Sequence, residues 1–161
     1  MAEQSYAIDV GHPPDLLLRL VNPLLNALLR TPLAGPAGKQ LMVLSFTGRK
    51  TGRQFTIPVS AHVIDNDLYA MTGAPWKQNF RGGAPAQVVY DGKTSTMQGE
   101  LIRDRAVVSD LHLRCAQLYG AKRAQRMMGL KFREQRIPTL EEFGEAVDRM
   151  HLAAIKFTPG K

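Results

Sequence analysis

The segment Leu41-Met-Val-Leu-Ser-Phe-Thr-Gly-Arg-Lys-Thr-Gly-Arg-Gln-Phe-Thr-Ile-Pro-Val59 decides the fold. It contains two strand-like runs joined by a short turn that holds Gly48 and Gly52. A tight hairpin turn needs residues with positive φ angles, and glycine adopts these without steric cost, so the two glycines have a purely structural explanation. The turn also carries three mutually repelling cations: Arg49, Lys50 and Arg53. We therefore expect a hairpin whose tip either binds an anion or merely keeps a strand edge soluble.

Length and composition predict a single globular domain. The 161 residues suffice for one core, and 44% hydrophobic with 22% charged residues is ordinary for a folded protein. The lone cysteine, Cys115, leaves no internal disulfide and no cysteine-based metal cluster, and the four histidines lack ligand spacing. We expect no metal site and a cytoplasmic, reducing environment.

The net charge of +7 is strong for this length. Residues 103–136 alone hold nine Lys and Arg residues against three acidic ones. Such an excess indicates a nucleic acid, an anionic membrane or an acidic small molecule as the partner. The aromatic and basic patterns of common nucleic-acid modules are absent, so we predict a small-molecule partner and no nucleic acid.

The N-terminal region, residues 1–38, is predicted to be an amphipathic helical segment followed by a linker. Polar residues recur every three or four positions within the Leu-rich stretch 13–33, at Asp15, Arg19, Asn22, Asn26 and Arg30. Pro23 predicts a helix start or kink, and the charges exclude a membrane span. The segment either covers one end of a barrel, lies on the inner face of the cell membrane, or forms a dimer contact.

Residues 39–161 read as a barrel domain with a helical insertion at about 105–150. We expect strands near 40–47, 54–64, 67–73, 86–91, 94–103 and 151–158. Hairpin turns are predicted at Asp65-Asn66-Asp67 and Asp91-Gly92, a helix at 105–119, and a second helix opened by the capping box Thr139-Leu-Glu-Glu142. The fold class is mainly β with flanking helices (α+β), arranged as a small barrel.

A second informative segment is Ala74-Pro-Trp-Lys-Gln-Asn-Phe-Arg81, which holds the only tryptophan of the chain. A planar apolar surface beside amide and cationic donors suits a flat ligand with an anionic group. Alternatively, Trp76 and Phe80, four residues apart, anchor a short helix on the barrel. The two interpretations are compatible with each other, and the residues alone favour the helix anchor.

Taken together, Gly48-Arg-Lys-Thr-Gly52, the Thr-x-Pro-Val run at 56–59 and the Trp-x-x-Asn-x-Arg run at 76–81 resemble the deazaflavin-dependent nitroreductase family. These are split β-barrel proteins related to the pyridoxamine-phosphate-oxidase-like flavoproteins. The resemblance covers about residues 40–103 and the closing strand near 152–158. It implies a split β-barrel that binds coenzyme F420, a deazaflavin with a phosphate and an acidic oligoglutamate tail. FMN is the alternative cofactor.

The resemblance also implies which residues of this chain bind the cofactor, because they stand at the positions that match the family's motifs. The family's tail-binding turn corresponds to Arg49, Lys50 and Thr51, and the strand beside the deazaflavin ring to Thr56, Ile57 and Pro58. Trp76 and Asn79 match the segment that closes over the cofactor. The chain has Phe55 where many relatives carry arginine, and Arg53 is the expected substitute. A short loop, Thr72-Gly73-Ala74, stands in place of a longer Gly-rich one, and with Lys77 it completes the expected site.

The resemblance implies hydride transfer between the deazaflavin and a small, lipophilic, electron-poor acceptor. Tyr119 and Ser60 are the candidate catalytic residues, as proton donors on the substrate side. The alternative is a non-enzymatic binder or carrier of F420, flavin, tetrapyrrole or fatty acid on the same barrel. The Met-containing stretch after residue 120 forms either a lid or a further surface helix, and a homodimer is compatible with the open strand edges.

Overall fold

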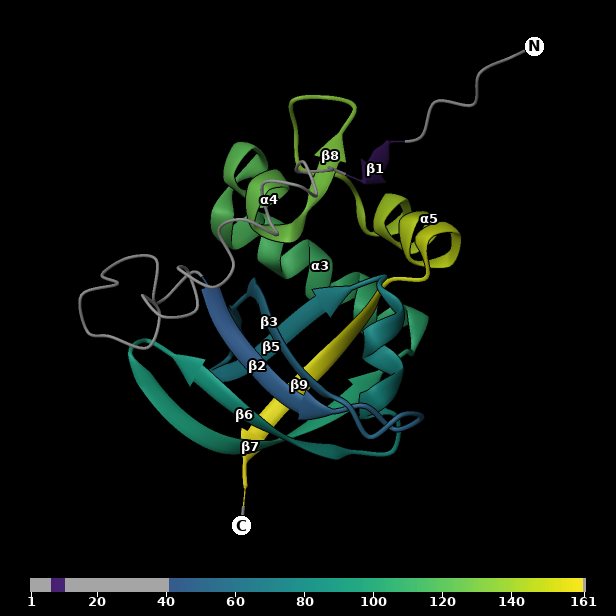
Figure 1. Ribbon diagram of the computed structural model, residues 1–161. Helices are drawn as coiled ribbons and strands as arrows, with labels where there is room; N and C mark the ends of the chain where they lie inside the picture. Colours follow the sequence, from purple (N-terminus) through teal and green to yellow (C-terminus); the bar gives the residue numbers. More distant parts are fainter. Residues whose placement is uncertain (1–6, 11–40, 161) are drawn as a thin grey trace, which may run out of the picture.

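The computed structural model describes residues 7–10 and 41–160. Its main feature is one antiparallel sheet of seven strands in the order β3-β2-β6-β7-β9-β5-β4. The strands are β2 (Leu41–Thr47), β3 (Gln54–Ser60), β4 (His62–Ile64), β5 (Asp67–Thr72), β6 (Ala84–Tyr90), β7 (Lys93–Ile102) and β9 (Ala153–Pro159). Figure 1 shows the sheet strongly curled, with β9 crossing behind β2. This confirms the predicted fold class, a mainly β split barrel with flanking helices.

The sheet curls because its two edge strands are directly connected in sequence. β3 and β4 are the outermost strands in the sheet order, yet only Ala61 separates them in sequence. The chain therefore draws the two edges toward each other, as closure of a barrel requires. The predicted single strand at 54–64 is in fact these two strands, broken at the residue where the chain passes from one edge to the other.

Local turn chemistry sets the register of the predicted hairpins. Asp65 and Asn66 have φ angles of 52° and 68°, and Asp91 and Gly92 have 51° and 74°. Two successive positive φ angles define the type I′ turn that matches the twist of antiparallel strands. Both turns were predicted at these positions and are confirmed.

The barrel interior is one of two hydrophobic cores. Alternate residues of β2, namely Met42, Leu44 and Phe46, point inward and are fully or almost fully buried. They meet inward side chains from the other strands, including Val88, Ile155 and Phe157. Alternation along a strand places every second side chain on one face, so the β2 pattern alone builds one wall of this core.

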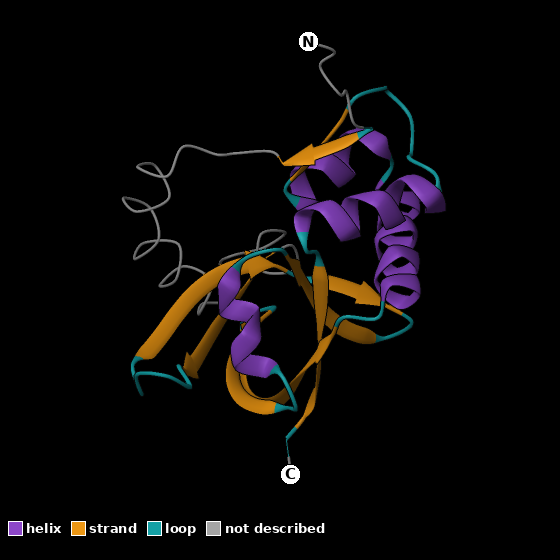
Figure 2. Ribbon diagram, turned by 90° about the vertical axis from the view of Figure 1, so that its right-hand side faces the viewer, coloured by secondary structure: helices purple, strands orange, loops and turns teal. Residues whose placement is uncertain are grey.

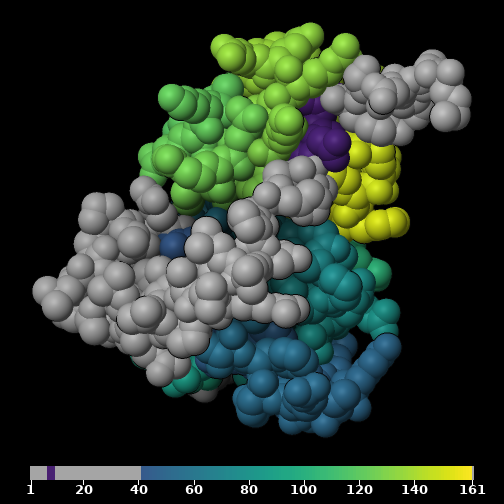
Figure 3. Space-filling model, turned by 45° about the horizontal axis from the view of Figure 1, so that its top comes forward, coloured from purple at the N-terminus to yellow at the C-terminus, as the bar shows by residue number. Residues whose placement is uncertain are grey.

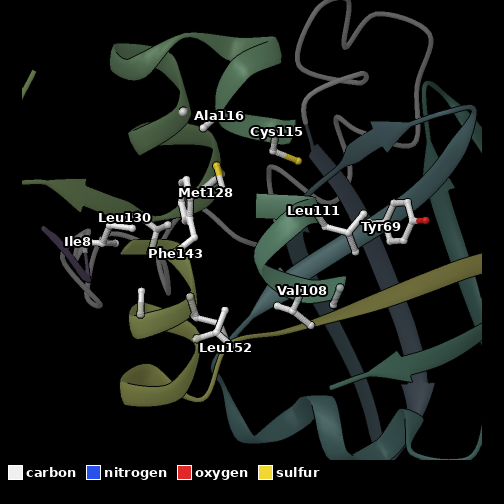
Figure 4. Close-up of a cluster of buried hydrophobic side chains, with 14 of the residues drawn as sticks. Ile8, Tyr69, Val108, Leu111, Cys115, Ala116, Met128, Leu130, Phe143 and Leu152 are labelled. Carbon is white, nitrogen blue, oxygen red and sulfur yellow. The ribbon is translucent and has the colours of Figure 1, made fainter. Parts of the chain in front are cut away.

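The helices gather at one end of the sheet and enclose the second core. They are α3 (Arg105–Tyr119), α4 (Ala121–Met128) and α5 (Leu140–Met150), while the 3-10 helix η2 (Pro75–Phe80) lies apart. Figure 2 shows this separation, with one short helix against the strands and the others grouped above them. Figure 4 shows Val108, Leu111, Met128, Phe143 and Leu152 converging in the second core. The helix predicted at about 105–119 is confirmed.

The segment after residue 120 packs into this second core. It forms α4 and then a short strand, β8 (Leu130–Phe132), which pairs with β1 (Ile8–Val10). Its apolar side chains Met127, Met128, Leu130 and Phe132 are all buried. The packing therefore fits the surface-helix interpretation and gives these side chains no role in a lid. The pairing of β1 with β8 was not predicted, because three-residue strands carry almost no periodic signal.

The N-terminal helical stretch predicted at 13–33 lies outside the described residues. Within residues 7–10 and 41–160, no helix is long and apolar enough to cross a membrane.

The predicted capping box at the start of α5 is confirmed. Thr139 Oγ1 accepts from Glu142 N at 3.1 Å, and Thr139 N donates to Glu142 Oε1 at 2.9 Å. Arg136 adds two bonds to the same carboxylate, from Nη1 at 2.7 Å and from Nη2 at 2.9 Å. The hydrogen bonds from Arg136, followed by that from the Thr139 backbone, lower the pKa of Glu142 to about 2.

This carboxylate makes stability depend on acidity. The pKa of Glu142 in the folded state lies below the ordinary value of 4.5, so its contribution is complete above about pH 4.5 and is lost as the pH falls toward 2. Glu142→Gln is expected to flatten this part of the stability profile, measured by urea denaturation between pH 2 and 6. Glu141→Gln, at the exposed neighbouring position, is the control and should leave the acid-sensitive slope in place. An unchanged slope in Glu142→Gln would contradict the prediction.

Candidate functional site

The β2–β3 hairpin tip is tied to η2. The backbone N–H of Arg49 donates to Asn79 Oδ1 at 2.9 Å, and Asn79 Nδ2 donates to the Trp76 carbonyl at 2.8 Å. The Arg49 guanidinium donates to the carbonyl of Arg81 and, at 3.5 Å, to that of Gly83. The two segments singled out in the sequence, thirty residues apart, therefore form one unit.

The shape of the tip depends on its two glycines. Gly48 N donates to Arg53 O at 2.7 Å, and Gly52 N donates to Gly48 O at 2.9 Å. Gly52 has a φ of 70°, and a Cβ on Gly48 would lie only 2.6 Å from a ring carbon of Phe55. Glycine at these positions lets the turn close tightly, which directs the neighbouring cationic residues outward. In the space-filling view the hairpin residues lie at the surface, along the lower edge of the molecule (Figure 3).

A groove of about 650 Å³ lies between the tip and η2. We call it the tip groove; it is lined by Gly48, Arg49, Lys50, Thr51, Phe55, Pro75, Gln78, Asn79 and Arg81. The lining contains three cations and no carboxylate. Within the described residues, none of these three cations belongs to an ion pair. The tip groove can therefore receive an anion without first displacing an acidic side chain.

One side of the tip groove is apolar. The ring of Phe55 is 38% exposed and stacks on Phe46 with a centroid distance of 5.6 Å. Pro75, the first residue of η2, also lines the groove. An exposed aromatic face beside cationic donors is the combination that a flat ligand with an anionic arm would use. The place of Phe55 in this wall was not predicted, and it follows from the hairpin register, in which Phe55 pairs with Phe46.

Trp76 packs on aromatic side chains of the barrel core. Its ring is half-buried and packs on Phe46 and Phe80, at centroid distances of 5.9 Å and 6.2 Å. It is not among the residues that line the tip groove. The structure therefore places Trp76 as an anchor of η2 on the barrel core, as one of the two interpretations expected.

Thr56, Ile57 and Pro58 continue along β3 away from the tip. Thr56 is exposed and shares a face with Ser45, whose Oγ lies 3.2 Å from Thr56 Oγ1. Ile57 packs against the barrel core on the opposite face. Pro58 lacks a backbone donor, and β3 accommodates it because it is an outermost strand of the described sheet. The strand could support a ring that extends from the groove, but these residues do not line it.

The two catalytic candidates lie at the far end of the same hairpin. Ser60 pairs with Leu41, whereas Gln54 at the tip end pairs with Thr47, and six residues of strand span about 20 Å. Tyr119, the last residue of α3, has its hydroxyl 2.8 Å from Nδ1 of His62. The structure thus brings Tyr119 and Ser60 near His62 and does not bring them to the tip groove.

The contact between the half-buried Tyr119 and the buried His62 is a polar pair that the sequence did not reveal. Burial, followed by the neighbouring Cys115, raises the pKa of Tyr119 to about 12. Burial, with a smaller effect of His112, lowers the pKa of His62 to about 3. The histidine is therefore neutral at physiological pH and the phenol is protonated. Either group can then be the donor of this hydrogen bond, depending on which ring nitrogen of His62 carries the proton. Arg123 lies over the Tyr119 ring at 5.4 Å from its centroid.

The loop Thr72-Gly73-Ala74 and Lys77 face the other side of η2. Thr72 Oγ1 accepts from Ala74 N at 2.9 Å, and Lys77 Nζ donates to Gly73 O at 3.0 Å. A Cβ on Gly73 would lie 2.6 Å from the carbonyl oxygen of Met150, at the end of α5. The short loop is therefore a close backbone contact with α5, and the predicted cofactor residues divide between the two sides of η2. Arg53 is exposed at the tip, where its backbone N–H donates to Thr51 Oγ1 at 3.3 Å.

Comparison with known proteins adds two distant structural likenesses. No protein-family model and no curated protein matches the chain. The conserved hypothetical protein Rv2991 from Mycobacterium tuberculosis is similar at a TM-score of 0.45 and 10% identity, over 98% of this chain and 87% of that one. An FAD and heme binding protein from Mycobacterium smegmatis is similar at 0.44 and 17% identity, over 96% of this chain and 69% of that one. At these scores neither likeness assigns a function.

Proposed function

We propose that this protein binds coenzyme F420 and uses it to reduce a small lipophilic acceptor. The tip groove supports this most directly, because Arg49, Lys50 and Arg81 line it without a carboxylate among the lining residues. An oligoglutamate tail and a phosphate supply the anionic groups that such a lining attracts. The overall charge of +7 adds long-range attraction for a polyanionic ligand.

The donor set and size of the groove fit the cofactor. Guanidinium groups bind carboxylate and phosphate through paired hydrogen bonds, and Arg49 and Arg81 both carry one. A volume of about 650 Å³ lies within the range of about 300–1,000 Å³ typical of small-molecule sites. The exposed face of Phe55 offers apolar contact to a planar ring. FMN, with one phosphate and no tail, would use fewer of these cations.

When bound, the deazaflavin supplies the hydride chemistry. The role of this chain is then to hold the anionic tail at the hairpin tip and to orient the ring along β3, past Thr56 and Pro58. Tyr119 is protonated at neutral pH, as a phenol ordinarily is, and burial raises its pKa further, to about 12, so its hydroxyl can hold a proton at that end of the hairpin. Ser60 is the second hydroxyl in that region.

A carrier without catalytic activity is the second candidate function. One observation favours it: the lining of the tip groove contains cations, an amide pair and a threonine, but neither of the candidate proton donors. Binding alone would not require Tyr119 or Ser60 to approach the ligand. Turnover separates the two functions, because an enzyme oxidises reduced F420 when an acceptor such as menadione is added, whereas a carrier only retains it.

Cofactor choice is tested by titrating F420 and FMN separately while following Trp76 fluorescence, with calorimetry as the second readout. Trp76 is the only tryptophan and contacts Phe46, which stacks on the groove residue Phe55. We expect saturable quenching by F420 beyond that of free tryptophan at equal absorbance. Quenching and binding heat with FMN but not with F420 would show that the cofactor is a flavin. No heat with either cofactor would overturn the proposal.

A further inference from the structure

A second cavity, of about 570 Å³, lies on the opposite side of η2 from the tip groove. We call it the η2–α5 cavity; it is lined by Gly73, Pro75, Lys77, Gln78, Arg103, Arg105, Val147, Asp148, His151, Leu152 and Ala153. The lining comes from η2 and the loop before it, from Arg103 and the first residue of α3, and from the end of α5 with the start of β9. Pro75 and Gln78 line both cavities, so η2 is their common wall.

Lys77 is the unusual residue of the η2–α5 cavity. The residue is only 6% exposed, and among the described residues its ammonium has one hydrogen bond, to Gly73 O at 3.0 Å. A lysine ammonium has three donors, and within the described residues no carboxylate pairs with this one. Burial, together with Arg103, lowers the pKa of Lys77. A buried cation with free donors is costly unless a counter-charge reaches it.

The remaining charges of the η2–α5 cavity leave a positive excess. Arg105 Nε is 2.7 Å from Asp148 Oδ2, so the only carboxylate in the lining is already paired. Arg105 also lies flat on α5, since a Cβ on Gly144 would come within 2.7 Å of its guanidinium. Arg103 is exposed and belongs to no ion pair within the described residues. Lys77 and Arg103 are therefore the two cations available to a ligand.

We infer that the η2–α5 cavity is a second anion-binding site, which takes the carboxylate or phosphate group of a small molecule with an apolar body. The anion would occupy the free donors of Lys77 and reduce its repulsion with Arg103. The apolar body would contact Pro75, Val147 and Leu152, which line the same cavity. This site goes beyond the proposed cofactor site, because none of the tip-groove cations lines it.

A purely structural role for Lys77 makes a different prediction. The Gly73 carbonyl and the last turn of α5 present partial negative charge, and a lysine there would stabilise the loop without any ligand. In that case replacing the ammonium would lower the melting temperature and leave no ligand-dependent effect. The two roles are thus separated by measuring ligand affinity and melting temperature on the same variants.

The test is calorimetric titration of the full chain with hexanoate and, separately, inorganic phosphate. We expect saturable binding of hexanoate, weakened at least about tenfold in Lys77→Met, which keeps the aliphatic stem and loses a charged hydrogen-bond donor. Lys50→Ala, in the tip groove, is the matched control and should bind hexanoate as the unmodified protein does. Binding of phosphate with the same dependence on Lys77 would also support the site.

Three results would overturn the inference: no binding of either probe, equal weakening by Lys50→Ala and Lys77→Met, or a lowered melting temperature in Lys77→Met with unchanged affinity. If Lys77→Met does not fold, Arg103→Met replaces it, because Arg103 is exposed and its loss leaves no buried vacancy. The test is independent of the cofactor proposal. The cofactor proposal predicts weaker F420 binding in Lys50→Ala, whereas the second site predicts weaker hexanoate binding in Lys77→Met, so either can fail without the other.

Discussion

Phe80→Ala is expected to lower the free energy of unfolding by about 3–5 kcal/mol, the range typical of a fully buried phenylalanine. Phe80 has no exposed surface and is in ring contact with Phe46 at 5.1 Å and Phe157 at 5.8 Å. Gly99 makes room for it, since a Cβ there would lie 2.6 Å from the Phe80 ring. Urea denaturation followed by far-ultraviolet circular dichroism measures the loss.

The same substitution should also remove the tip groove. Phe80 and Trp76 fasten η2 to the barrel core, and η2 supplies Asn79 as the partner of Arg49. We therefore expect Phe80→Ala to bind F420 more weakly even where it is fully folded. Leu118→Ala, at a residue 65% exposed on α3, is the control and should change the stability by less than about 0.5 kcal/mol. A loss below about 1 kcal/mol in Phe80→Ala would show that η2 does not depend on this anchor.

Arg49→Ala is expected to weaken F420 binding by about 10- to 150-fold, which corresponds to about 1.5–3 kcal/mol for a lost charged hydrogen-bonding group. Arg49 contributes twice: its charge faces the tip groove, and its guanidinium holds the tip to the backbone of Arg81 and Gly83. Lys50→Ala removes a charge without breaking these ties. The smaller loss in Lys50→Ala then measures the charge effect alone.

Two comparisons make this prediction specific. Arg126→Ala lowers the net charge by the same amount from an exposed position on α4, and it should leave the affinity nearly unchanged. The Lys50→Ala substitution should weaken the binding of a tail-less deazaflavin less than it weakens the binding of F420, because the tail carries the carboxylates. If Arg49→Ala and Arg126→Ala weaken F420 equally, the effect is general electrostatic attraction and the tip groove does not bind the tail.

Much of the fold was predictable because its signals are local. The type I′ turns at Asp65-Asn66 and Asp91-Gly92, and the capping box at Thr139, depend on a few neighbouring residues and were found at the predicted positions. The strand expected near 40–47 was found as β2. The contact between the hairpin tip and η2 agrees with the idea that these two segments act together, which came from the resemblance.

The rest depended on packing between distant segments. The sequence gives Trp76 the same signature whether it faces a ligand or a core, and only the contacts with Phe46 and Phe80 decide. The distance between the tip groove and Tyr119 could not be read from composition, because it follows from the length and register of β2 and β3. The η2–α5 cavity was equally hidden, since Lys77 and Arg103 are brought together only by the sheet order.

The contact of Gly73 with Met150 has a mechanical consequence. At this point the backbone before η2 meets the end of α5 with no side chain between them, so the joint has no compressible layer. A shift of α5 must therefore displace the start of η2, and with it the wall shared by both cavities. We expect the barrel and the helical part to unfold as one cooperative unit, with amide hydrogens of α5 and η2 exchanging at similar rates. Strain introduced on the helical side would thus be transmitted to η2 at this glycine.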